Sequence, residues 1–303
     1  MLWLPLALLG AASQAGYSLT VKVFLRHIPP LFLAGYSFLA SSLVLFSVVF
    51  ATGIPPLGPG LVPAVAATVA INTVATILLY RALSTTDLSL CIPILAFTPV
   101  FLILTSFLIL GEIPSLPGGI GIILVAAGAF LLTAKSGQGL SASLRAPFLT
   151  LRRVPGVRSM FFVAFLYSLS VNFDKEVVLN SNPIFGSAVV FFLLAAIFLI
   201  IAVSAGTRWP KAAPGNPDPV SPPHPSARIL LPGAVGILLA IEAISINTAY
   251  TMAIVPYVIT IKRLSIFFSV LFGGLLLHEQ DIRGRMAGAL VMIAGAAVIG
   301  LWG

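Results

Sequence analysis

Ten apolar segments of about 20 residues follow one another along this chain of 303 residues. A helix of about 20 apolar residues is long enough to cross the hydrocarbon core of a bilayer. Pro and Gly stand at most junctions between segments, as expected where helices end. We therefore predict an all-α integral membrane protein with ten transmembrane helices. The predicted spans are residues 2–22, 30–51, 60–80, 87–110, 115–134, 157–175, 183–205, 229–252, 255–277 and 284–302.

The composition excludes several other classes of protein. Only 8% of the residues are charged, whereas a soluble domain has about 25%. The net charge of +8 comes from basic residues in short connections between apolar segments, so nucleic-acid binding is not expected. The single cysteine excludes an intrachain disulfide, and we expect no metal and no cofactor. Single, scattered acidic residues argue against an intramembrane lipid-modifying enzyme.

The chain repeats itself. Residues 22–32 align without gaps with residues 175–185, Leu-Gly-Glu112 mirrors Leu-His-Glu279, and Gly121 matches Gly288. Each half then has five spans, and an odd number forces the second half into the opposite orientation. We predict two inverted five-helix repeats around a central cavity. They are residues 1–134 and 157–303, joined by a basic loop (135–156), with a Pro-rich loop at 206–228 in the second repeat.

The same motifs carry a resemblance. The run from Tyr80-Arg-Ala-Leu through Pro93 and Pro99 to Leu-Gly-Glu112, followed by a Gly-rich helix, resembles an EamA domain of the drug/metabolite transporter superfamily. The segment from Tyr250 through Glu279 to Gly288 resembles a second copy, although His replaces the usual Gly before Glu279. The resemblance implies metabolite transport, with export favoured. We expect a multi-pass protein of a bacterial or archaeal inner membrane, either a monomer or a homodimer.

Two adjacent cations, Lys262 and Arg263, lie in the middle of the ninth predicted span. A charge in hydrocarbon costs roughly 3 kcal/mol on insertion scales, so these side chains must face protein or water. One interpretation is a site for a phosphate or carboxylate anion, with Arg as a bidentate donor. Triose-phosphate and nucleotide-sugar translocators, which the chain resembles distantly, often carry such residues there. The other interpretation is an internal ion pair with Glu242, and both can hold.

Further polar residues lie on the third and eighth predicted spans. Either they line a substrate pocket or they form interhelical hydrogen bonds. We predict substrate contacts for Lys262, Arg263, Glu242, Asn72, Thr76, Tyr80, Asn247 and Tyr250. Lys22 and its repeat-mate Lys175, with Asp174, are predicted to form gates or access paths at opposite faces. Lysines that reach the interface from helix ends are the alternative.

These features predict an alternating-access secondary transporter for a small anionic metabolite, coupled to H+ or to an antiported solute. Export of amino acids or other zwitterionic solutes is the alternative. All Lys and Arg except Lys175, Lys262 and Arg263 lie in or beside connections that follow odd-numbered spans. By the positive-inside rule, both termini are then outside the cytoplasm.

Overall fold

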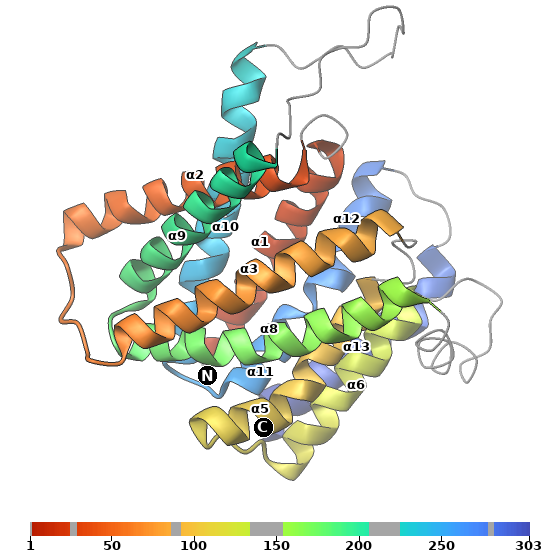
Figure 1. Ribbon diagram of the computed structural model, residues 1–303. Helices are drawn as coiled ribbons and strands as arrows, with labels where there is room; N and C mark the ends of the chain where they lie inside the picture. Colours follow the sequence, from red (N-terminus) through yellow and green to blue (C-terminus); the bar gives the residue numbers. More distant parts are fainter. Residues whose placement is uncertain (1, 25–28, 86–91, 134–153, 206–224, 278–281) are drawn as a thin grey trace, which may run out of the picture.

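The computed structural model describes residues 2–24, 29–85, 92–133, 154–205, 225–277 and 282–303, and within these ranges it contains helices and no strand (Figure 1). The helices are α1 (Trp3–Phe24), α2 (Pro30–Thr52), α3 (Leu61–Thr85), η1 (Ile92–Phe97), α5 (Thr98–Leu110), α6 (Leu116–Thr133), α8 (Pro155–Leu179), α9 (Pro183–Ser204), α10 (Pro225–Tyr250), α11 (Val255–Lys262), α12 (Ser265–Leu277) and α13 (Ile282–Trp302).

Each of the ten predicted spans corresponds to helical structure. Within the described residues, six helices are long and apolar enough to cross a membrane, and three shorter apolar helices accompany them. The six run over 30–52, 61–79, 155–179, 183–204, 233–250 and 255–272. The protein is therefore a multi-pass membrane protein. The predicted loops 135–156 and 206–228 fall largely outside the described residues, and α8 and α10 begin inside them.

The fourth and ninth spans are broken, whereas the sequence predicted continuous helices there. The fourth consists of η1 followed by α5, and the ninth consists of α11 followed by α12. At the second break the backbone tightens into bonds between residues three apart: Leu264 N–H donates to Ile261 O at 2.9 Å and Ile266 N–H to Arg263 O at 3.0 Å. No Pro or Gly marks this break, so local sequence rules did not predict it.

The two breaks occupy equivalent places in the predicted repeat. The offset of 167 residues that aligns Glu112 with Glu279 also aligns Thr98, where α5 begins, with Ser265, where α12 begins. Pairs of interrupted helices at matching positions are typical of transporters that bind their solute at the break.

Helices of one half pack mainly against helices of the other. α3 packs along α8 and α1 along α10, which places the third span of each half against the first span of the other. α2 pairs with α9, and α6 pairs with α13 (Figure 1). The core of the molecule therefore lies between the halves rather than within each.

α6 and α13 cross closely at glycines and run antiparallel. A Cβ on Gly288 would lie 2.3 Å from Leu132 N, and one on Gly295 would lie 2.8 Å from Gly121 O. Since Gly121 meets Gly295 while Gly128 meets Gly288, the two helices run in opposite directions. Small residues permit such close backbone approach without a hydrophobic driving force in lipid.

Candidate functional site

Lys262 is the last residue of α11 and points to a carboxylate on α10. Its Nζ lies 2.5 Å from Glu242 Oε1, with 25% of the lysine and 8% of the glutamate side chain exposed. The amide nitrogen of Gln14 on α1, in the orientation that satisfies both groups, donates to both carboxylate oxygens at 2.7 and 2.9 Å. The internal ion pair that the sequence suggested is therefore present, and a third helix supports it.

Arg263, the next residue, has no such partner. Its Nε is buried without a hydrogen bond, and the described residues provide no ion pair for its guanidinium. Tyr167, Glu242 and Tyr250 are close enough to interact with it electrostatically. A guanidinium has five N–H donors and is always charged. Arg263 therefore presents a partly buried positive charge whose Nε has no hydrogen-bond partner among the described residues.

A polar seam joins α3 and α8 beside these cations. Thr68 Oγ1 donates to Asp174 Oδ1 at 2.5 Å and lies 2.8 Å from Ser170 Oγ. One turn further along, Asn72 Nδ2 donates to Ser170 Oγ at 2.5 Å. The next turn brings Thr76 beside Tyr167 of α8. The seam thus leads from the neighbourhood of Arg263 to the carboxylate of Asp174.

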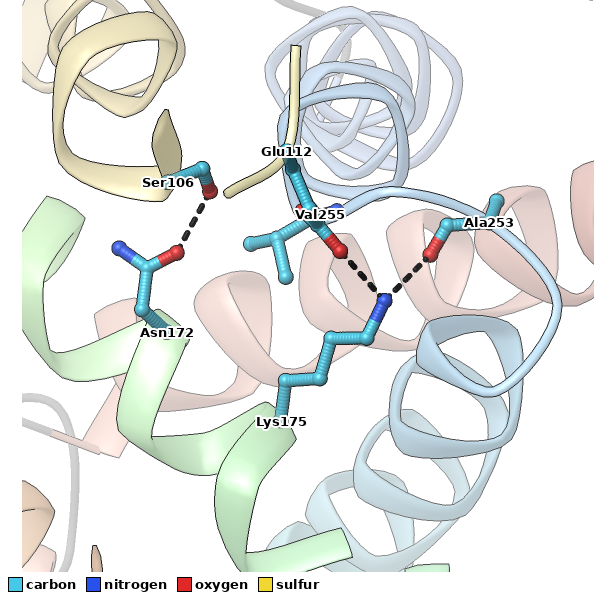
Figure 2. A network of polar contacts seen from close by, with 6 residues as sticks. All are labelled: Ser106, Glu112, Asn172, Lys175, Ala253 and Val255. Carbon is cyan, nitrogen blue, oxygen red and sulfur yellow. Dashed lines mark hydrogen bonds and ion pairs between the residues drawn. The ribbon is translucent and has the colours of Figure 1, made fainter. Parts of the chain in front are cut away.

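A second charged cluster, here called the latch, consists of Lys175, Glu112, Ala253 and Val255 (Figure 2). Lys175 Nζ lies 2.6 Å from Glu112 Oε1 and donates to Ala253 O at 3.0 Å. Glu112 Oε2 accepts from Val255 N–H at 2.8 Å, which caps the first turn of α11. The latch therefore ties α8, the α5–α6 connection and the α10–α11 connection together.

The surroundings of the latch are also joined across the halves. Tyr257 on α11 accepts a hydrogen bond from Ser115 N–H at 2.8 Å, and Ser115 Oγ donates to Trp302 O at 3.1 Å. Gly60 N–H donates to Asn180 Oδ1 at 3.0 Å. Contacts between distant parts of the chain therefore hold this end of the molecule.

Comparison with known proteins identifies the first repeat. Residues 1–134 match the family described as EamA-like transporter family. This half is an EamA-like transporter domain. The match confirms the resemblance inferred from residues 80–121, and the matched family belongs to the drug/metabolite transporter superfamily.

Structural comparison extends beyond the matched half, while no curated protein matches the chain in sequence. Twenty-three chains of solved structures match it. One of them, a crystal structure of a protein whose description names no function, has a TM-score of 0.74 and 16% identity over 99% of this chain and 96% of its own. The EamA-like domain and the rest of the chain therefore share one known fold across nearly all 303 residues.

The other predicted site residues lie in different places. Asn72 and Thr76 belong to the polar seam, and Tyr250 is buried near Arg263. Asn247 instead donates to Ser187 on α9 at 2.6 Å, which is the interhelical bond that the sequence left open. The side chains of Tyr80 and Lys22 lie outside the described residues.

Asp174 and Lys175 do not close the sixth span as predicted, because α8 continues to Leu179. They lie more than one turn inside the helix, Asp174 toward the seam and Lys175 toward the latch. Thr68, Tyr167 and Ser170 were not among the site residues predicted from the sequence. Their spacing was a usable signal, because 68, 72 and 76 share one face of a helix, as do 167, 170 and 174.

Proposed function

We propose that this protein is a secondary transporter that moves a small organic anion across the membrane by alternating access. The observation that carries the proposal is the guanidinium of Arg263, which lies beside Lys262 at the break of the ninth span. Its residue is partly buried, its Nε is buried without a hydrogen bond, and the described residues provide no ion pair for it. A buried cation without a partner is costly in a membrane protein, and a function is the usual reason to keep it.

The surrounding groups suit a phosphate or a carboxylate. Arg263 supplies a bidentate fork and Lys262 a point charge. Glu242 pairs with Lys262, and Gln14 supports the Glu242 carboxylate, so the lysine is held in position by the protein itself. α12 begins at Ser265, directly after the pair, and the positive end of its dipole adds to the local potential.

Alternating access is supported by the relation between the halves. Two inverted repeats would produce three features of this fold. The first span of each half packs against the third span of the other, α6 and α13 cross in antiparallel directions, and the breaks lie at matching positions. The latch would close one face while the site opens to the other. The central cavity, the direction of transport and the bacterial or archaeal inner membrane stay predictions.

A proteoliposome exchange assay tests the proposal. Proteoliposomes that contain the full chain are loaded with phosphorylated compounds, carboxylates or amino acids in turn. Counterflow of each radiolabelled solute is then measured. We expect saturable exchange of one anionic class, lost when Arg263→Gln or Lys262→Gln is introduced. Arg158→Gln is the matched control, because Arg158 is an exposed arginine at the start of α8. Full exchange in the Arg263 variant would exclude the proposed anion site.

Export of amino acids or other zwitterionic solutes is a second candidate. The observation that favours it is the satisfied network of Lys262, Glu242 and Gln14, which offers both charge signs beside the unpaired Arg263. A zwitterion could place its carboxylate on Arg263 and its ammonium near Glu242. Competition separates the candidates: unlabelled amino acids would inhibit counterflow in this case, and phosphorylated compounds would not.

A further inference from the structure

Asp174 is a carboxylate that the proposed anion site does not use. It is partly buried on α8, and its oxygen accepts a hydrogen bond from the Thr68 hydroxyl at 2.5 Å. Within the described ranges, no Lys or Arg lies at ion-pairing distance from it, unlike Glu112 and Glu242. An ionised carboxylate inside a membrane protein is costly without a cation. Binding a proton is the simplest way to remove that cost.

The hydrogen bonds around Asp174 suit either protonation state. Thr68 has one hydroxyl proton and donates it to Asp174, so Ser170 is the donor in the Ser170–Thr68 bond of 2.8 Å. Asn72 in turn donates to Ser170. Hydroxyl groups can donate or accept, so Thr68 can also accept a proton from a neutral Asp174. An ammonium partner would lack this freedom, because it can only donate.

Other charged and titratable groups around Asp174 are engaged elsewhere or act from a distance. On its own helix, Lys175 is held by Glu112, and Glu176 is 3.4 Å from the amide nitrogen of Asn180. Lys262 attracts Asp174 electrostatically. The facing helices α3, α5 and α9 offer no Asp, Glu, His or Lys within the described residues, and the only Arg on them is Arg81 near the end of α3. The remaining groups that face this region are Tyr167 on α8, Glu242 and Tyr250 on α10, and Arg263 after α11.

The charge of the region depends on Asp174. Lys262 and Arg263 contribute +2, while Glu242 and an ionised Asp174 contribute −2, so the empty site is neutral. When Asp174 is protonated the sum is +1, and a bound monovalent anion returns it to zero. Charge is expensive at low dielectric, so the two neutral forms are favoured over the empty protonated and the loaded ionised forms.

We propose that Asp174 is a proton-binding site and that a proton and a monovalent anion are carried together in the same direction. The proposal rests on the proposed function, because it assigns a coupling ion to the same site. Binding of one partner favours the other, and this linkage is reciprocal. The proton adds to an oxygen of the Asp174 carboxylate and leaves from it unchanged, so no other reactant is needed.

Infrared spectroscopy tests the proton site without any substrate. The full chain in liposomes is titrated across the acid to neutral range, and the C=O stretch of protonated carboxylic acids is followed. We expect a titrating band that Asp174→Asn removes and that the control Glu176→Gln retains. A band that survives in Asp174→Asn, or that Glu242→Gln removes instead, would overturn the assignment. So would a band that shifts with sodium at constant pH.

Coupling is tested with methanesulfonate, a monovalent anion whose charge does not change with pH. Thermal stabilisation of the protein should show about tenfold tighter binding at acid than at alkaline pH, a typical size for coupling between sites. In Asp174→Asn binding should be tight and independent of pH. The same pH dependence in the variant would overturn coupling through Asp174. A protein that titrates at Asp174 and ignores the anion at every pH contradicts the proposed anion site and keeps the proton site.

Discussion

Lys262 and Arg263 are neighbours in the chain, but only Lys262 has an ion-pair partner among the described residues. Lys262 has a carboxylate at 2.5 Å, which an amide on a third helix supports. Arg263 has a buried Nε with no acceptor. Satisfied charges contribute to folding, whereas a buried donor without a partner reduces stability. At the scale of the residue, Lys262 therefore fits the structural interpretation, an internal ion pair, and Arg263 fits the functional one, an anion site.

Replacing Arg263 should separate stability from function. Arg263→Met removes a buried unsatisfied donor, which costs about 1–3 kcal/mol, and keeps an unbranched side chain of similar reach. We expect an equal or higher unfolding temperature together with loss of anion binding, a trade-off common at functional sites. Thermal unfolding in detergent measures the first, and solute-induced stabilisation measures the second.

Arg158→Met is the control for this pair of measurements, since Arg158 is exposed. It should change neither the unfolding temperature nor the binding. A clear loss of stability in Arg263→Met would mean that the guanidinium stabilises the fold and is not kept for anion binding alone.

At the scale of the element, glycines of α6 and α13 face one another where the two helices cross. Gly128 faces Gly288, and Gly121 faces Gly295. Backbone atoms, not flexible side chains, occupy the space that a Cβ at Gly288 would need. This contact joins the last spans of the two halves, so its geometry fixes how the halves sit together.

Gly288→Ala should therefore destabilise the protein. Its Cβ would lie 2.3 Å from Leu132 N, and insertion of a methyl group into a packed interface typically costs about 1–3 kcal/mol. Gly119→Ala on α6 is the matched control, because nothing lies within 4 Å of its Cβ position. Thermal unfolding of both variants measures the difference. Equal stability of the two would show that α6 and α13 are not in close contact.

At the scale of the whole molecule, α11 connects the latch to the anion site. Its first residue donates to Glu112, and its last residue is Lys262. Every residue from Val255 to Ile261 is buried, so α11 cannot move independently of the helices packed around it. α8 makes a second connection, because Asp174 and Lys175 are consecutive. An opening of the latch would therefore displace both the cations and the proposed proton site.

Weakening the latch should expose its face of the protein. Glu112→Gln removes the ion pair with Lys175 and keeps an oxygen that can accept from Val255 N–H. With Cys91 replaced by Ser and Ala253 by Cys, we expect a membrane-impermeant thiol reagent to label position 253 severalfold faster in Glu112→Gln. Glu176→Gln, which leaves the ion pair intact, should label at the parent rate. An unchanged rate in Glu112→Gln would assign Lys175 and Glu112 a purely structural role.

Much of the architecture was predictable from the sequence. Hydropathy located the ten helical spans, because the cost of placing polar groups in lipid adds up residue by residue along a segment. The Glu112 and Glu279 motifs predicted a repeat, and the family match confirmed the interpretation of residues 1–134. The positions of Lys262 and Arg263 marked the candidate site, since charges in apolar segments are rare.

The tertiary structure alone decided which charges meet. Glu112 and Lys175 are 63 residues apart, and Thr68 and Asp174 are 106 apart, so no local pattern pairs them. It also decided that Lys262 is satisfied while Arg263 is not, and that the ninth span breaks beside them. Segment hydropathy is a property of neighbours along the chain, whereas ion pairs and helix breaks depend on side chains that only packing brings together.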